Sequence, residues 1–248
     1  EALSNKKRRA RLDAIRDACR AYITGPLRDF LAAQLADAAS GAGRIEIDEA
    51  DPDGQTLLVW YPEVEPRDDD YVRPAVRIES GAKSALDPNR PVTIHPYIAE
   101  DAAGLNLAVG DVTTIEATRT FWDKVVIAHG LRRWYERRGV LRQEGQRVSR
   151  HYYDLHCLLG SDVGKAALAD RDLGADCVRH ARMFFDRPDY DLASAVSGTF
   201  AIAPVGEMTD ALRRDYANTT AMIFGVAPAF DEILSSAAAI EQAINRSD

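Results

Sequence analysis

Two different spacings of hydrophobic residues run along this chain. Between residues 44 and 115, apolar and polar side chains tend to alternate, which is the period of a half-buried β-strand. Before and after that stretch, apolar residues return every three or four positions, which is the period of an amphipathic helix. The pattern predicts an α+β fold, with a mixed β-sheet lobe over residues 1–117 and an α-helical bundle lobe over residues 118–248.

The helical spacing predicts helices before and after the strands along the chain. Ser4 or Asn5 can cap the first helix, and Gly25-Pro26 is expected to break it before a second helix that runs to about Ala39. Further helices are expected over residues 116–138, 147–160, 163–169, 173–185, 206–224 and 229–245.

The alternating region predicts five strands joined by turns. The run DPDG at 51–54 is typical of a hairpin turn, and the acidic run PRDDD at 66–70 is expected to be a solvated loop. The predicted strands cover residues 44–49, 55–61, 71–80, 92–98 and 112–115.

Composition narrows the class of protein. A hydrophobic fraction of 46% is enough for a globular core, and a net charge of −8 argues against a uniformly basic binder. Three widely spaced cysteines, Cys19, Cys157 and Cys177, fit a reducing cytoplasm better than a disulfide framework. We find neither a signal-peptide pattern nor an apolar run long enough to span a membrane, so no membrane partner is expected.

The predicted strand VRIES contains a carboxylate that is a candidate for chemistry. Alternation puts Arg77 and Glu79 on one face of the strand, and Ser80-Gly81 follows directly. Glu79 can form a salt bridge with Arg77 at the sheet face. It can also be a metal ligand at the end of a strand, where the backbone of Gly81 allows a ligand to approach.

Two predicted helices carry further candidates. Lys124 in RTFWDKVVIAHGL is either a solvated lysine or a ligand for a phosphate group. In SRHYYDLHCLL, Asp154 follows His151 by three positions and Arg150 by four, so the three side chains share a helix face. The Arg150–Asp154 pair can simply stabilise its helix, by some tenths of a kcal/mol.

Two basic segments stand out in an otherwise acidic chain. Each can be a solvated face or a footprint for phosphate and nucleic acid. The sequence contains no GxSxG, GxGxxG or GxxxxGK[ST] motif, and His95, His129, His156 and His180 lack metal-binding spacing. The basic segments are NKKRRAR at 5–11 and the run Arg132, Arg133, Arg137, Arg138, Arg142, Arg147 and Arg150.

Four runs in a fixed order resemble the AbiEii/AbiGii nucleotidyltransferase toxins of type IV toxin–antitoxin and abortive-infection systems. The resemblance spans roughly residues 4–160. It implies that residues 1–117 are the remainder of a DNA-polymerase-β-type nucleotidyltransferase lobe. It also implies the transfer of a nucleoside monophosphate from an NTP to an acceptor, RNA such as a tRNA end. The four runs are RPAVRIESGAKS, PVTIHPYIAED, TRTFWDKVVIAHG and SRHYYDLHCLL.

The resemblance also implies roles for single residues. Glu79 corresponds to the third of three metal-binding acids and would bind Mg²⁺ or Mn²⁺. Lys124 and Asp154 correspond to catalytic residues of the nucleotide cleft, and Arg77, Arg150 and His151 are the candidate substrate-binding residues. The implied partners are the NTP, an RNA acceptor that binds the Arg-rich 132–150 segment, and a cognate antitoxin protein that acts directly or indirectly.

The chain departs from the family pattern in one respect. The family's other two metal-binding acids form a DxD pair after a Gly-Gly or Gly-Ser turn, and no such motif precedes VRIES. Asp68-Asp69-Asp70 follows Pro66-Arg67 and has no glycine turn. We therefore expect the DxD segment to precede Glu1 and this chain alone to be inactive. The alternative is a non-catalytic RNA- or antitoxin-binding module of degenerate nucleotidyltransferase fold.

Overall fold

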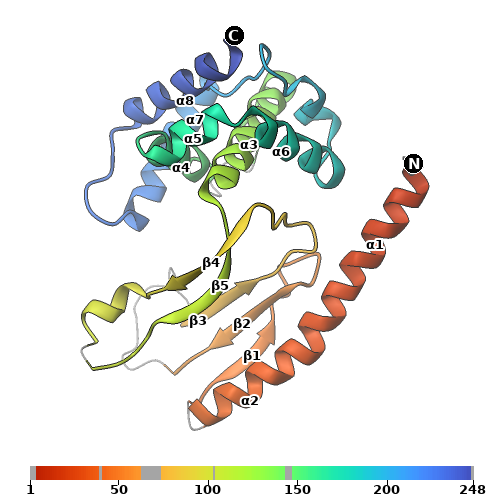
Figure 1. Ribbon diagram of the computed structural model, residues 1–248, viewed down its shortest axis with the longest axis vertical. Helices are drawn as coiled ribbons and strands as arrows, with labels where there is room; N and C mark the ends of the chain where they lie inside the picture. Colours follow the sequence, from red (N-terminus) through yellow and green to blue (C-terminus); the bar gives the residue numbers. More distant parts are fainter. Residues whose placement is uncertain (1–3, 39–40, 63–73, 103, 143–146, 247–248) are drawn as a thin grey trace. The chain divides into compact units, whose positions relative to one another are not determined.

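The computed structural model describes residues 4–38, 41–62, 74–102, 104–142 and 147–246 (Figure 1). It confirms the α+β class, since helices are combined with small antiparallel sheets. Contacts within the chain divide it into two compact units, Glu1–Ser84 and Ala85–Asp248. We call them the N-terminal and the C-terminal unit.

The N-terminal unit begins with one long helical stretch. The Ser4 side chain accepts a hydrogen bond from the backbone of Lys7 and so caps α1 (Asn5–Tyr22). The break expected at Gly25-Pro26 does not occur. A π-helical turn, η1 (Ile23–Leu27), leads directly into α2 (Arg28–Ala38). A π turn widens the backbone locally, which accommodates a proline that has no N–H to donate.

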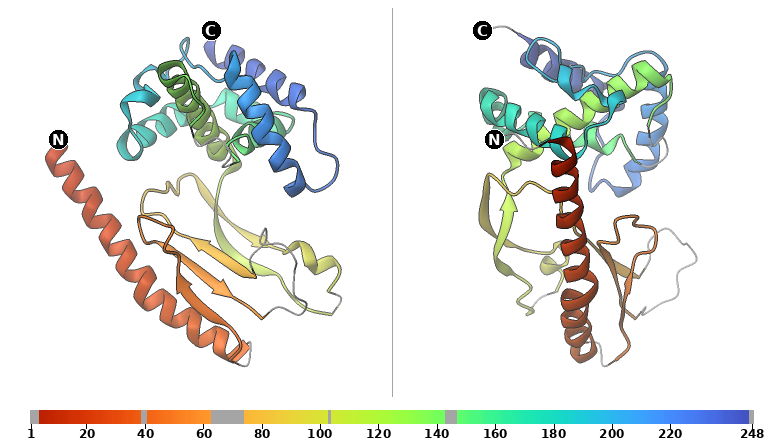
Figure 2. Two further views of the ribbon diagram at one scale, coloured as in Figure 1. Left: turned by 180° about the vertical axis from the view of Figure 1, so that it is seen from behind. Right: turned by 90° about the vertical axis from the view of Figure 1, so that its right-hand side faces the viewer.

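The strands of the N-terminal unit form an antiparallel sheet in the order β1-β2-β3, with β1 (Arg44–Ile47), β2 (Thr56–Trp60) and β3 (Ala75–Glu79). The predicted hairpin turn forms between β1 and β2, where the Asp51 carboxylate accepts hydrogen bonds from the backbone of residues 53 and 55. Figure 2 shows α2 beside β1, and α1 extending well past these strands. The acidic run 66–70 lies outside the described residues.

The C-terminal unit starts with a second antiparallel pair, β4 (Asn89–Ile94) and β5 (Val109–Ile115), joined through the short helix η2 (Tyr97–Glu100). The described strands therefore form two separate antiparallel sheets, not the single mixed sheet that we expected. The β4–β5 pair is grouped with the helices, so the contact division falls earlier in the chain than residue 117. The predicted lobe boundary at 117/118 stays a prediction.

The core of the C-terminal unit is built on α3 (Ala117–Arg138), whose buried face includes Phe121, Trp122 and Val125. The Trp122 indole donates a 2.8 Å hydrogen bond to the Ala167 carbonyl. Gly174 allows this packing, because a Cβ there would lie only 2.8 Å from the indole ring. The other helices are α4 (Arg150–Leu159), α5 (Asp162–Ala169), α6 (Arg171–Phe184), α7 (Glu207–Thr219) and α8 (Phe230–Asn245), with short turns η3 (Pro188–Tyr190), η4 (Leu192–Ser194) and η5 (Thr220–Met222).

Candidate active site

Three of the predicted site residues meet in the C-terminal unit. The Lys124 Nζ lies 2.6 Å from Oδ2 of Asp154 and 3.1 Å from Nδ1 of His151. Lys124 belongs to α3, and both partners belong to α4. His151 and Asp154 are three positions apart, so they present neighbouring side chains to the lysine. We call Lys124, His151 and Asp154 the lysine cluster.

Apolar anchors on both helices position the lysine cluster. Phe121 and Val125 are fully buried and fix the rotation of α3, while Tyr152 and Leu155 do the same for α4. The two helices contact each other. Because each apolar stripe faces the core, the intervening polar positions lie at the edge of the α3–α4 contact, where Lys124 meets its partners.

Burial makes His151 a neutral member of the cluster. Desolvation, together with the positive charges of Lys124 and Arg150, lowers the pKa of His151 to about 3. A neutral imidazole has one acceptor nitrogen, so Nδ1 can accept a hydrogen bond from the ammonium of Lys124. Asp154 supplies the negative charge and His151 supplies an uncharged acceptor.

The ammonium of Lys124 keeps donor capacity for a ligand. It has three N–H bonds, and the two contacts within the cluster use two of them. The Lys124 side chain is 20% exposed and that of Asp154 37% exposed, so the pair is reachable from solvent. This arrangement can hold one N–H in a fixed direction toward an anionic group.

Arg150 does not form the ion pair with Asp154 that the helical spacing allows. Within the described parts of the chain, the ion pair of Asp154 is with Lys124 on the neighbouring helix. Arg150 is exposed at the first turn of α4. The role of Arg150 in substrate binding stays a prediction, as does that of His151, which contacts Lys124.

Sequence reasoning missed Asp215, a buried residue of α7 that holds the start of α4. Its two carboxylate oxygens accept hydrogen bonds from the backbone N–H groups of Arg147, at 3.0 Å, and Ser149, at 2.7 Å. Arg147 has a positive φ of 59°, so the chain makes a sharp turn there. The sequence feature that could have identified Asp215 is its position on the apolar face of a helix, three residues after the buried Leu212.

The remaining predicted site residues lie in the N-terminal unit, at the end of β3. Arg77 Nη1 lies 2.6 Å from Oε1 of Glu79, and its Nε lies 3.1 Å from Oδ2 of Asp48. The salt bridge weighed as an explanation for Arg77 and Glu79 is therefore present. Glu79 is exposed, with a side chain 65% accessible, while Asp48 is buried under the guanidinium of Arg77.

The described residues do not by themselves make a metal centre. No group of three or more His, Cys, Asp or Glu side chains within the described ranges lies close enough to hold a metal ion. Glu79 offers one carboxylate, and one of its oxygens is bound by Arg77. A divalent ion such as Mg²⁺ takes six oxygen ligands, of which carboxylates are usually one or two. Asp68-Asp69-Asp70 lies outside the described residues.

Most arginines of the predicted RNA-binding segment bind the protein itself. Their guanidinium groups connect the end of α3 to the segment 188–203 through carboxylates, backbone carbonyls and aromatic rings. These arginines therefore have a structural role, and RNA binding by the 132–150 segment stays a prediction. The contacts are Arg132 with Glu136 and Ala203, Arg133 with Glu136 and Thr199, Arg137 with Asp191, Arg138 with Asp189, and Arg142 with the Trp134 and Tyr190 rings.

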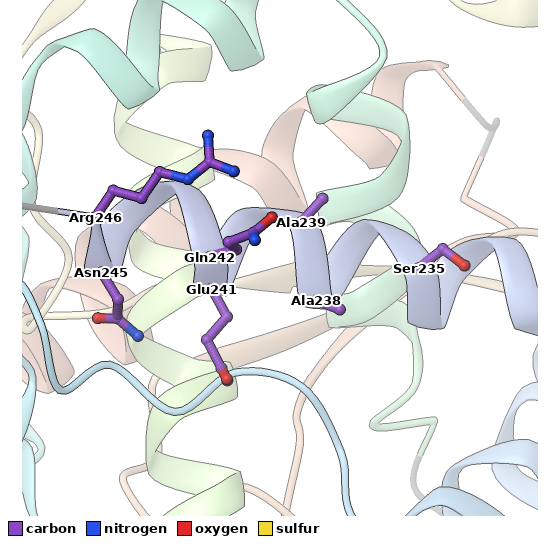
Figure 3. A pocket seen from close by; sticks show the side chains of 7 residues that line it. All are labelled: Ser235, Ala238, Ala239, Glu241, Gln242, Asn245 and Arg246. Atoms are coloured by element: carbon purple, nitrogen blue, oxygen red, sulfur yellow. The ribbon is translucent and has the colours of Figure 1, made fainter.

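A hollow lies along α8, and the carboxylate in its lining, Glu241, is bound to the protein backbone (Figure 3). Glu241 turns toward the loop before α7 and accepts hydrogen bonds from the backbone N–H groups of Ile202, at 2.6 Å, and Ala203, at 2.9 Å. Asn245 pairs with the backbone of Phe200. These side chains close the loop onto α8, and the hollow contains none of the predicted site residues.

The α+β fold fits the class of nucleotidyltransferases to which the sequence motifs pointed. The chain belongs to the family described as nucleotidyl transferase AbiEii toxin, type IV TA system, whose model matches residues 2–236. The resemblance is thereby confirmed, and the match includes the helices after residue 160. No curated protein and no solved structure matches the chain. Within its described residues, no helix is long and apolar enough to cross a membrane.

Proposed function

We propose that this protein transfers a nucleoside monophosphate from an NTP to the hydroxyl of an RNA acceptor, such as a tRNA end. Membership of a nucleotidyl transferase toxin family supports the reaction class. The observation that carries the proposal is the lysine cluster, in which Asp154 and neutral His151 orient the Lys124 ammonium. The three free cysteines fit action in the reducing cytoplasm.

The chemistry explains why a fixed ammonium is useful. The acceptor oxygen forms a bond to the α-phosphorus, the bond from that phosphorus to the bridging oxygen of the β-phosphate breaks, and pyrophosphate leaves. The acceptor hydroxyl gives up its proton to solvent or to a base. Negative charge accumulates on the phosphate oxygens, and a preorganised donor stabilises that charge in the transition state. Lys124 supplies this donor, and Asp154 and His151 determine its direction.

The proposal includes a divalent ion, Mg²⁺ or Mn²⁺, with Glu79 as a ligand. Arg77 binds Oε1 of Glu79, and a carboxylate has a second oxygen that a metal can take. Further ligands are required beyond those that the described residues bring together. We expect EDTA to abolish transfer and added Mg²⁺ or Mn²⁺ to restore it, measured with labelled NTP. Transfer that is unaffected by EDTA and equal in Glu79→Gln contradicts the metal's role.

The reaction is tested by incubating the full-length encoded protein with each labelled NTP and total RNA. Wild type is expected to label RNA, and Lys124→Ala to lose at least a hundredfold in rate. The matched control is Lys165→Ala, which removes a lysine that is 82% exposed and paired only with Asp162 at the surface. Equal labelling by wild type and Lys124→Ala would sink the proposal, as would the absence of any labelling by wild type.

The second candidate function is a non-catalytic binding module for RNA or for an antitoxin. The observation in its favour is the ion pairing of Arg77 with both Glu79 and Asp48, which gives Glu79 a structural role. This function predicts RNA or antitoxin binding that persists in Glu79→Gln and Asp154→Asn, with no label transfer from any NTP. Label transfer by wild type excludes it.

An antitoxin completes the proposal, because the family description names a toxin–antitoxin system. We propose that a cognate antitoxin protein counteracts the toxin, either by contact or indirectly. Co-purification of the toxin with the antitoxin indicates action by contact. Rescue of growth by an antitoxin that does not co-purify indicates indirect action.

A further inference from the structure

The basic segment at the start of α1 differs from the arginine-rich segment 132–150 in its contacts. The side chains of its lysines and arginines are all exposed, and among the described residues none of them forms a side-chain hydrogen bond, an ion pair or a ring contact. The first turn of α1 contains no acid, and the first acid along the helix is Asp13. These cations, which we call the α1 basic cluster, are Lys6, Lys7, Arg8, Arg9 and Arg11.

The α1 basic cluster places like charges close together. A helix turns by about 100° per residue, so Lys7, Arg8 and Arg11 lie on about a third of its circumference. Lys7 and Arg11 are four positions apart and Arg8 and Arg11 three, which are the spacings at which like charges repel on a helix. Positive side chains at a helix N-terminus also oppose the macrodipole. A polyanionic partner offsets both costs.

The arginines at the end of α3 differ from the α1 basic cluster in their partners. Arg132, Arg133 and Arg138 are neutralised by carboxylates or bound to carbonyls within the C-terminal unit. The α1 basic cluster keeps its full charge available, in a protein whose net charge is −8. A concentrated patch of one sign in a chain of the other sign attracts a ligand of opposite charge to that patch.

The pattern of apolar residues favours a nucleic acid over a lipid surface. Between residues 6 and 11 the only uncharged residue is Ala10, so this part of α1 has cations on several sides and no broad apolar face. A helix that lies in a membrane surface needs such a face opposite its charges. Phosphate contacts by lysine and arginine need only exposed charge. The N-terminal end of α1 extends past the strands of its unit (Figure 2).

We propose that the α1 basic cluster binds the phosphate backbone of the acceptor RNA. The proposal rests on the proposed function for the identity of the RNA, and it moves the RNA-binding surface from the Arg-rich 132–150 segment to α1. The cluster contributes affinity and orientation without reading sequence, because contacts to phosphate carry no base information.

The test measures binding of fluorescein-labelled tRNA to the full chain by anisotropy, without NTP, over a range of salt concentrations. The variant is Lys7→Glu/Arg8→Glu/Arg11→Glu. We expect at least a tenfold loss of affinity at low salt, and a salt slope smaller by about two to three, since each phosphate contact contributes roughly 0.7–0.9 to the slope. Lys7→Arg/Arg8→Lys/Arg11→Lys keeps the charge and is expected to bind like wild type.

The matched control carries the same change of charge at exposed positions of the C-terminal unit, Lys165→Glu/Arg182→Glu/Arg187→Glu. It is expected to bind within about threefold of wild type. Equal losses in the control and the α1 variant, or no loss in the α1 variant, overturn the proposal. So does binding of wild type to vesicles of phosphatidylserine and phosphatidylcholine in preference to tRNA. Circular dichroism verifies that each variant is folded.

The result separates this proposal from the proposed function. Wild type that labels RNA, together with an α1 variant that binds and labels RNA equally well, overturns the RNA surface and leaves the reaction intact. Wild type that binds tRNA through α1 and labels nothing supports the surface and contradicts the reaction.

Discussion

Lys124 is a lysine with one charged and one neutral acceptor, and the two have different consequences when they are removed. Asp154 neutralises the ammonium at 2.6 Å, whereas His151 accepts a hydrogen bond without adding charge. Loss of Asp154 leaves a half-buried cation without its counter-charge, while loss of His151 leaves the charge balance unchanged. Experiments on these two residues therefore separate charge from direction.

Substitution of Asp154 by asparagine keeps the shape of the side chain and removes the charge. We expect Asp154→Asn to lower label transfer by at least a hundredfold if Lys124 acts on the phosphates. The free energy of unfolding is expected to fall by only about 0.2–1 kcal/mol, because the pair is partly exposed and screened by solvent. Transfer assays and urea unfolding measure the two effects. A large loss of stability without loss of transfer contradicts the catalytic role.

The low pKa of His151 predicts a specific dependence of stability on pH. Between pH about 6.5 and about 3, the unfolded state binds a proton at this histidine and the folded state does not. Stability therefore falls as the pH is lowered through this window, by up to about 1.4 kcal/mol per pH unit from this group. Urea unfolding at a series of pH values should show a flatter slope in His151→Gln than in wild type. Identical slopes contradict the buried neutral histidine.

At the scale of residues, the resemblance predicted the contact partner of Asp154 better than helical spacing did. The motif resemblance linked Lys124 with Asp154, and the structure places them in contact. Helical spacing equally allowed Arg150 to pair with Asp154, and that pair does not form in the described structure. The choice depends on how α3 packs against α4, which a spacing rule within one helix does not contain. The functional roles of these residues stay predictions.

At the scale of elements, the position of α4 depends on one acid from α7. Asp215 is buried and accepts hydrogen bonds from two backbone N–H groups at the turn into α4. The Ser149 hydroxyl also lies 3.1 Å from that of Thr219, one turn further along α7. The start of α4 is thus tied to α7, and the direction in which α4 presents His151 and Asp154 follows from that tie.

Removal of the Asp215 carboxylate leaves two buried donors without acceptors. We expect Asp215→Ala to lower the free energy of unfolding by about 2–4 kcal/mol, because each unsatisfied buried group costs about 1–3 kcal/mol. The matched control is Asp210→Ala on the same helix, which is exposed and should cost less than about 1 kcal/mol. Chemical denaturation of both variants measures the difference. A similar loss in both contradicts the proposed support of α4.

Periodicity predicted the helices well and the proline turn poorly. The 3.6-residue spacing located α3 to α8 within a few residues, because each of them buries one apolar face. Gly25-Pro26 is usually a helix break, and here a π turn replaces it. Ile23 of η1 is buried, and η1 contacts β2 of the N-terminal unit.

At the scale of the whole molecule, the two units differ in how much core they have. Among the described residues of the N-terminal unit, the buried hydrophobic ones are Ile23, Leu57 and Leu58, whereas the C-terminal unit buries a large cluster around α3. A small buried apolar area gives little free energy to offset conformational entropy. The N-terminal unit is therefore expected to be the less stable of the two.

Hydrogen exchange on the full chain tests this difference. Backbone amides of β1, β2 and β3 are expected to exchange faster than those in the middle of α3, α4 and α8. Leu57→Ala should accelerate exchange in the strands of its own unit, because it removes a fully buried side chain. Its counterpart is Leu155→Ala, which should act on the helices. Equal protection of both units contradicts the expectation.

The sequence predicted the fold class but not the separation of the strands. Alternation identifies a strand, and it does not specify which strand is its neighbour. The described strands pair only with neighbours along the chain, in two antiparallel groups. The β4–β5 pair belongs to the C-terminal unit, and a hydrogen bond from the Glu116 backbone N–H to the Pro88 carbonyl extends that pair to the start of α3, which no periodicity reveals.

The packing of Trp122 has a spectroscopic consequence. Trp122 is buried in the core of the C-terminal unit, and Trp60 lies on β2 of the N-terminal unit, under the guanidinium of Arg44. Each unit therefore carries its own natural fluorophore. Versions of the protein that keep one of these tryptophans and replace the others by phenylalanine would report the melting of each unit separately, by emission colour and intensity, without any attached dye.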